Sequence, residues 1–408
     1  MTLAEFQDNV NRQAPGAEIR FCGGEPTFHQ QFSEMLIWAI HGTANPVIIM
    51  TNGIWPDRIR EKMAGFSVEE WKRVSILFNL LEEDFYTPED YKRLIRVLET
   101  VYPLNAIIGF TIYTREFRFK HILDLAVKFN IPSLRYSIAA PTTGNWSGRH
   151  FRPEDYAELA TPVYDFIMAA DKLGLAVSSD CGYIPFCMFS EKQQRDLLIL
   201  SRRGSVIKFH CDSATDIGSG GEAWRCYGLY DVLRTRTDRF KSIEEATLFF
   251  DNQVRQLNPL YMYEACKHCE FIKGGICGGG CYVYRVAERL EKDESFNPFP
   301  LDDDLWLLNA RPKINPEVSL WTAGTGERAA VLPVSTRFGR TLLHFQDGEN
   351  PVSFYEVFKG CTGDNTVQEI IDKWVHRFDN EKTAAQFVLY AVRLFFTQKA
   401  VDFFPSDI

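Results

Sequence analysis

The sequence predicts an α/β fold built on a parallel sheet, open or barrel-like, followed by a cysteine-rich segment and a small α+β module. Short β-rich runs alternate with amphipathic helical stripes up to about residue 180. Eight of the ten cysteines then fall between Cys181 and Cys281. Strands that recur with a helix between each pair form right-handed crossovers, and such crossovers build parallel sheets.

Six β-rich runs are the expected strands of this sheet: residues 18–22, 47–50, 74–78, 106–112, 134–138 and 175–178. Apolar residues spaced for one face of a helix lie between or after them, in residues 32–40, 91–101, 119–127 and 156–167. Active sites of parallel sheets gather at the carboxyl ends of the strands. We therefore expect functional residues directly after these runs.

The cysteine-rich segment, residues 181–304, has little periodicity apart from possible helices at 243–256 and 283–292. A linker with Pro298, Pro300 and the acidic run 302–304 follows. In the last module we expect a strand at 337–345 entering a turn at 347–348, a helix opened by the capping box of Thr366 and Glu369, a helix at 387–396 and a strand at 399–404. The expected domains are residues 1–180, 181–311 and 312–408.

Charge and composition exclude several classes of protein. The 408 residues include 45 Lys+Arg and 54 Asp+Glu, a net charge of -9, which argues against a general nucleic-acid binder. No apolar run approaches the roughly 20 residues that span a bilayer, and the first residues do not form a signal peptide. We therefore expect a cytoplasmic protein, in which clustered thiols indicate metal ligands rather than disulfides.

The spacing of the cysteines supports metal binding. The six that show the clearest spacing pattern are Cys211, Cys226, Cys266, Cys269, Cys277 and Cys281. A Cys-x2-Cys pair brings two sulfurs to one centre, and the eight clustered cysteines suffice for two four-thiolate sites. Soft thiolates select zinc or iron–sulfur clusters, and the spacing alone does not separate these two.

A second motif, Gly23-Gly24-Glu25-Pro26, directly follows the first expected strand. Two glycines let the backbone turn tightly and approach a ligand closely. Glu25 would then offer an acceptor to the ammonium group of a ligand. The alternative interpretation is an ordinary turn between a strand and a helix.

Together these features resemble a known family. Residues 21–27, Phe-Cys-Gly-Gly-Glu-Pro-Thr, resemble the GGEP motif on the second strand of radical S-adenosylmethionine (SAM) enzymes. Thr51-Asn52-Gly53 resembles the TNG that commonly closes their third strand. The cysteine order is similar to the SPASM extension, which holds auxiliary [4Fe-4S] clusters. The last module resembles the small winged-helix domain of pyrroloquinoline-quinone biosynthesis, which grips the leader peptides of ribosomally made natural products.

The resemblance implies a partial radical SAM (β/α) barrel without its first strand, a SPASM-like domain and a winged-helix-like module. It implies that Gly23, Gly24, Glu25 and Pro26 hold the methionine end of SAM. Asn79 lies where the family often contacts the ribose, but the usual serine-x-acid pattern is absent there, and a turn residue is the alternative.

The resemblance also implies two auxiliary clusters. The ligands of the first would be Cys211, Cys226, Cys281 and either Cys187 or Cys181. The ligands of the second would be Cys266, Cys269 and Cys277. The final downstream cysteine of the family is missing, and the carboxylates of residues 302–304 are its nearest substitutes.

One departure concerns the radical-generating cluster. The family carries a Cys-x3-Cys-x2-Cys loop ahead of GGEP, and no cysteine precedes Cys22 here. We expect the chain as given not to cleave SAM by itself. Either the start belongs to a longer enzyme, or the lineage has lost this cluster and keeps a peptide-binding scaffold.

The function implied by the resemblance is a radical SAM/SPASM-type maturase that abstracts hydrogen from a ribosomally made peptide or protein. Its partners would be a precursor peptide or protein and a reductant protein. The alternative is a non-catalytic peptide-binding or electron-transfer iron–sulfur partner of an intact radical SAM enzyme. A plain zinc protein is the third possibility.

Overall fold

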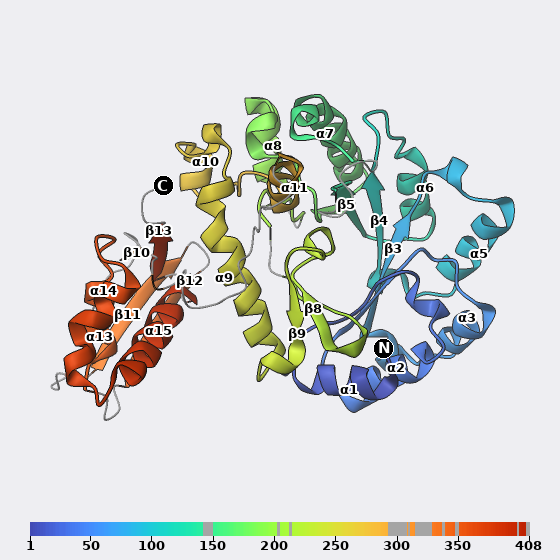
Figure 1. Ribbon diagram of the computed structural model, residues 1–408. Coiled ribbons are helices and arrows are strands. Elements are labelled where there is room, and N and C mark those ends of the chain that lie inside the picture. Colours follow the sequence, from blue (N-terminus) through green and yellow to red (C-terminus); the bar gives the residue numbers. More distant parts are fainter. Residues whose placement is uncertain are drawn as a thin grey trace. The chain divides into compact units, whose positions relative to one another are not determined.

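The computed structural model describes residues 1–141, 150–201, 205–211, 214–292, 308, 311–314, 329–336, 339–346, 351–397 and 400–404. The chain divides into two compact units (Figure 1). The first unit comprises residues 1–250 with 261–296, and the second comprises 251–260 with 297–408. The boundaries expected at residues 180 and 311 stay predictions.

The first unit contains a six-stranded sheet in which every strand pairs in parallel with the next along the chain. Its strands are β1 (Ile19–Phe21), β2 (Val47–Thr51), β3 (Val74–Leu80), β4 (Ala106–Ile112), β5 (Ser133–Ile138) and β6 (Ala176–Ser179). The six predicted strands and their parallel pairing are confirmed. Strand residues such as Ile49, Phe78 and Ile108 are fully buried, as expected for a parallel sheet.

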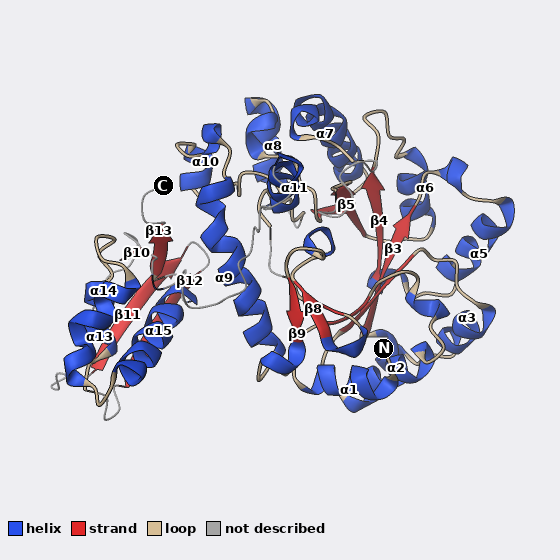
Figure 2. Ribbon diagram, in the orientation of Figure 1, coloured by secondary structure: helices blue, strands red, loops and turns tan. Residues whose placement is uncertain are grey.

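Helices follow the strands and cover one side of the sheet (Figure 2). They are α2 (Phe32–Gly42), α3 (Asp57–Ala64), α4 (Val68–Trp71), α5 (Pro88–Leu98), α6 (Lys120–Lys128) and α7 (Tyr156–Lys172), and α1 (Leu3–Asn11) precedes β1. The sequence places α2, α5, α6 and α7 correctly because each has an apolar stripe, whereas α3 and α4 were not predicted. In α5, for example, Leu94, Val97 and Leu98 are buried.

Residues 181–292 contain more regular structure than the sequence predicts. The two expected helices are present, as α9 (Ile243–Tyr261) and α11 (Tyr282–Lys292). The structure adds α8 (Glu191–Ser201), α10 (Glu270–Lys273) and a small antiparallel sheet of β7 (Asp216–Ile217), β8 (Glu222–Trp224) and β9 (Arg234–Arg236). These elements are short or weakly patterned. In α8, Leu197 and Leu200 are buried while Leu198 and Ile199 are exposed, which obscures the helical period.

The second unit is an α+β module. Strand β10 (Arg311–Ile314) pairs antiparallel with β13 (Val401–Phe404), and β11 (Ala329–Thr336) with β12 (Gly339–Gln346). Its helices are α13 (Phe354–Gly360), α14 (Val367–Trp374) and α15 (Glu381–Thr397). The predicted capping box of α14 is confirmed. The expected turn at 347–348 and the acidic run 302–304 lie outside the described residues.

The sequence predicts neither a membrane-spanning helix nor disulfides. No helix within the described part of the chain is both long and apolar enough to cross a bilayer. All ten cysteines are described, and none forms a disulfide.

Candidate functional site

The first part of the site is the turn that follows β1. Gly23 and Gly24 have φ values of 84° and 46°, in the left-handed region that glycine adopts without strain. The next residue, Glu25, caps the short 3₁₀ helix η1 (Pro26–Phe28). The glycine pair thus turns the chain so that the Glu25 side chain faces the carboxyl end of the sheet.

The Glu25 carboxylate joins the ends of two neighbouring strands. Its Oε1 accepts hydrogen bonds from the Thr27 hydroxyl at 2.6 Å and from the Thr51 hydroxyl at 2.8 Å. Its Oε2 accepts one from the Asn52 amide at 2.8 Å. A carboxylate oxygen can accept two bonds, so Oε2 retains capacity for a ligand donor. The GGEP and TNG motifs therefore form a single hydrogen-bonded unit.

The TNG segment is held rigidly after β2. The Thr51 hydroxyl accepts bonds from the Gly53 amide and from the Trp55 indole nitrogen, at 3.1 Å and 2.9 Å. Gly53 has a φ of 78°, and a Cβ there would lie 2.5 Å from the Leu94 side chain. A larger residue there would have a strained backbone and would have to move the Leu94 side chain of α5. The segment is thus a fixed partner for Glu25.

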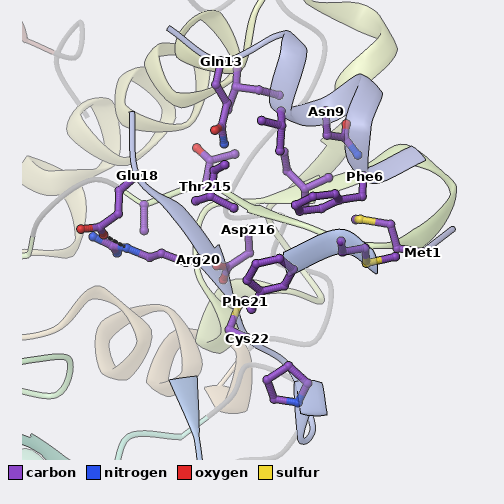
Figure 3. Close-up of a pocket in the computed structure, with 18 of the residues that line it drawn as sticks. Met1, Phe6, Asn9, Gln13, Glu18, Arg20, Phe21, Cys22, Thr215 and Asp216 are labelled. Atoms are coloured by element: carbon purple, nitrogen blue, oxygen red, sulfur yellow. Dashed lines mark hydrogen bonds and ion pairs between the residues drawn. The ribbon is translucent and has the colours of Figure 1, made fainter. Parts of the chain in front are cut away.

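A cavity of about 690 Å³ lies beside β1 (Figure 3). The residues predicted to hold SAM, from Gly23 to Pro26, contribute to its lining, with α1 and parts of residues 214–219 and 243–247. Cys22 and Asp216 also line it. No pattern in the sequence indicates Asp216, because it stands in a segment without clear periodicity. Loss of hydration raises the pKa of Asp216. Desolvation, and then the Asp216 charge, raise the pKa of Cys22.

Asn79 lies apart from this cavity. It is exposed on β3, opposite Gly109 of β4. Its Oδ1 is 3.1 Å from the position that a Cβ on Gly109 would occupy. The structure therefore brings four of the five predicted SAM residues together along one cavity. The fifth, Asn79, lies on β3 and does not line this cavity.

The second part of the site is formed by the cysteines, which separate into two groups by their electrostatic neighbours. We define the first thiol set as Cys181, Cys211, Cys226 and Cys281. Burial raises the pKa of Cys281 to about 12, and the Cys211 and Cys226 thiols add to this shift. Burial, and then Cys211, raise the pKa of Cys226 to about 11. Cys181 is exposed as a whole residue, but desolvation of its thiol, then Asp180, and then the three other members raise its pKa.

We define the second thiol set as Cys187, Cys266, Cys269 and Cys277. Partial burial raises the pKa of Cys187, and the three other members of the set add to the shift. Partial burial, then Cys277 and Cys269, raise the pKa of Cys266. The protonated thiol is therefore favoured at the members whose pKa is raised, and a bound metal must displace their protons.

Two buried arginines accompany the thiols. Arg225 is 4% exposed, and its Nη1 donates to the Cys211 sulfur at 3.3 Å. Arg285 is 3% exposed, and its Nη2 donates to the Gly280 carbonyl at 3.2 Å, next to Cys281. A buried guanidinium favours the anionic form of neighbouring thiols. Their position directly before Cys226 and shortly after Cys281 carried no recognisable signal in the sequence.

Each thiol set offers four sulfur donors, which suit either a zinc ion or an iron–sulfur cluster. No three His, Cys, Asp or Glu side chains among the described residues are placed to hold a metal ion. Four sulfurs around one zinc would lie about 3.8 Å apart, because the Zn–S bond is about 2.3 Å. A [4Fe-4S] cluster binds each thiolate through a different iron and accepts wider spacing. Four thiols in each set fit such a cluster in donor type and number.

Comparisons with known proteins give only distant likenesses. No protein-family model matches the sequence, and no curated protein matches it significantly. Streptococcus suis SuiB bound to S-adenosylmethionine is 15% identical, with a TM-score of 0.47 over 73% of this chain and 68% of that one. Native anSMEcpe with bound AdoMet is 15% identical, with a TM-score of 0.45 over 72% and 87%. SuiB bound to the precursor peptide SuiA is 17% identical, with a TM-score of 0.44 over 71% and 64%.

Proposed function

We propose that this chain belongs to a radical SAM/SPASM-type maturase that modifies a ribosomally made peptide or protein. The observation that carries the proposal is the occurrence, in one compact unit, of a Glu25-centred turn beside a cavity and two sets of four thiols. Neither feature alone points to this function, since glycine turns and cysteine clusters both occur widely. Their combination on a parallel sheet supports it.

The residues Gly23, Gly24, Glu25 and Pro26 would hold the methionine end of SAM in the cavity beside β1. The free capacity of Glu25 Oε2 supports this role, because an ammonium group needs an acceptor. Asn79 is proposed only as a ribose contact. In the family that the chain resembles, reductive cleavage of SAM supplies hydrogen abstraction, and auxiliary clusters supply an electron acceptor or a substrate ligand.

The second unit would hold the leader of a precursor peptide, which would raise the effective concentration of the core peptide near the sheet. A reductant protein would be the other partner, and the cytoplasm the compartment. A second candidate is a non-catalytic iron–sulfur partner that binds peptide for an intact enzyme. The hydrogen bonds of Glu25 with Thr27, Thr51 and Asn52 favour this candidate, since they give the carboxylate a structural use that needs no SAM.

The test uses the full chain reconstituted anaerobically with iron and sulfide. We expect iron and sulfide in the protein, SAM binding by calorimetry, and binding of precursor peptides encoded by neighbouring genes. Peptide binding without SAM binding would support the non-catalytic candidate instead. Zinc in place of iron, with no affinity for either SAM or peptide, would overturn both.

A further inference from the structure

The sequence pattern gives the second auxiliary site only three cysteine ligands, Cys266, Cys269 and Cys277, and the packing of the first unit supplies a fourth. We propose that Cys187 is the fourth ligand of the second site and that Cys181 is the fourth ligand of the first. This assignment deepens the proposed function and depends on it for the identity of the metal. It differs from the sequence prediction, which allowed either cysteine at the first site and turned to carboxylates for the second.

The segment that carries Cys187 packs against the loop of the second set. Cys187 lies in the 3₁₀ helix η5 (Phe186–Met188). The Phe186 ring meets the Phe271 ring edge-on, with centroids 4.9 Å apart. Phe271 follows Cys269 by two residues, and its carbonyl accepts the Cys277 amide at 3.2 Å. One aromatic contact thus fixes η5 to the residue that organises the Cys269–Cys277 loop.

The glycine run after Cys277 gives an independent set of contacts. The Gly279 amide donates to the Cys277 sulfur at 3.4 Å, and a Cβ on Gly279 would lie 3.7 Å from the Cys266 sulfur. A Cβ on the next residue, Gly280, would lie 3.8 Å from the ring of Pro185. Two thiols of the second set and the start of the Cys187 segment therefore meet at adjacent glycines.

Cys181 is fixed to a different place, the carboxyl end of β5. Its carbonyl accepts the Ile138 amide at 3.1 Å. The carbonyl of the next residue, Ala139, accepts a hydrogen bond from the Tyr284 hydroxyl at 2.8 Å. Tyr284 lies in the first turn of α11, the helix that begins directly after Cys281. Cys181 and Cys281 are thereby anchored to successive residues of one strand end.

The intervening residues separate the two cysteines. Gly182 has a φ of 69°, and its ideal Cβ position is 1.9 Å from the Ile138 carbonyl oxygen, so the chain turns sharply against β5 directly after Cys181. The Tyr183 hydroxyl then donates to the Gly280 carbonyl at 2.9 Å. The short stretch from Cys181 to Cys187 thus runs from the first set to the second. Each thiol would lose its proton on binding metal, with no change of oxidation state.

Single-site proteins test the assignment. The full-length variant C211A/C226A/C281A keeps only the second site, and C266A/C269A/C277A keeps only the first. Each is reconstituted with iron and sulfide and should retain about four irons per chain. Adding Cys187→Ala should lower the iron content of the second-site protein at least twofold and leave the first-site protein unchanged. Adding Cys181→Ala should have the opposite pattern.

Alkylation followed by mass spectrometry provides a readout that needs no further substitution. In the loaded second-site protein, Cys187 should be protected from iodoacetamide and Cys181 labelled, and the loaded first-site protein should show the reverse. The triple variant D302N/D303N/D304N of the second-site protein is the matched control and should keep its iron. Loss of iron in this control, with no effect of Cys187→Ala, would overturn the assignment. Zinc in place of iron, with the same protection pattern, would support the assignment and contradict the proposed iron–sulfur function.

Discussion

At the scale of single residues, Glu25 connects two strands that carry the proposed SAM site. Replacement by alanine leaves the buried Thr51 hydroxyl and the Asn52 amide without their acceptor. We expect Glu25→Ala to lower the free energy of unfolding by about 2–4 kcal/mol, since hydrogen bonds to a charged group are lost. Urea denaturation measures this loss. Glu25→Gln keeps one acceptor oxygen, so its free energy of unfolding should lie between those of the wild type and Glu25→Ala. As a control, Glu34→Ala, on the exposed face of α2, should change the free energy of unfolding by less than about 0.5 kcal/mol.

Cys361 provides a pH-dependent prediction at the same scale. Burial raises its pKa from 9.0 to about 12. The folded state therefore keeps a proton that the unfolded state releases above about pH 9. The stability contributed by the protonated thiol is fully present below about pH 9 and is lost as the pH rises toward 12. Relative to Cys361→Ala, the wild-type protein should lose roughly 1.4 kcal/mol per pH unit in this window.

Urea unfolding of both proteins under reducing conditions, between neutral pH and about pH 11, measures this difference. Val357→Ala is the control, because Val357 is equally buried on α13 and carries no proton. The difference in free energy of unfolding between wild type and Val357→Ala should be the same at every pH. A constant difference between wild type and Cys361→Ala would contradict the raised pKa.

At the scale of elements, the turn after β6 positions the first thiol set. A Cβ on Gly182 would meet the backbone of β5, whereas one on Gly174, which has a similar φ of 74°, would meet nothing within 4 Å. Gly174→Ala should therefore cost only the left-handed backbone strain of roughly 1–2 kcal/mol. Gly182→Ala should cost at least about 2 kcal/mol more, because β5 or the turn must move.

Thermal unfolding compares the two glycine variants, and iron content gives a second readout. We expect Gly182→Ala to lower the iron bound by the first-site protein and Gly174→Ala to leave it unchanged. Equal stability of the two variants would show that the turn can relax away from β5.

At the scale of the whole molecule, the two compact units should respond differently to loss of metal. All the proposed ligands lie in the first unit, while the second unit has its own core around Phe358 and Phe395, whose ring centroids are 5.1 Å apart. Chelation should therefore destabilise the first unit, since metal binding contributes to its folding free energy. Hydrogen exchange should increase in α10 and α11 and stay unchanged in α13 to α15. Equal loosening of both units would contradict this independence.

The sequence by itself determined the six parallel strands, the helices α2, α5, α6 and α7, and the places of the glycine turn and the cysteines. These features follow from local periodicity and from glycine and cysteine chemistry, which a linear pattern records. Only the tertiary structure decided that Glu25 bonds to Thr51 and Asn52, that Asp216 faces the cavity beside β1, and which of the clustered thiols raise the pKa of Cys181 and which that of Cys187. The physical reason is long-range packing, which leaves no periodic trace in the chain. Cys181 and Cys187 are close in sequence, but the Cys181 carbonyl bonds to the end of β5, whereas Phe186, next to Cys187, packs against the Phe271 ring.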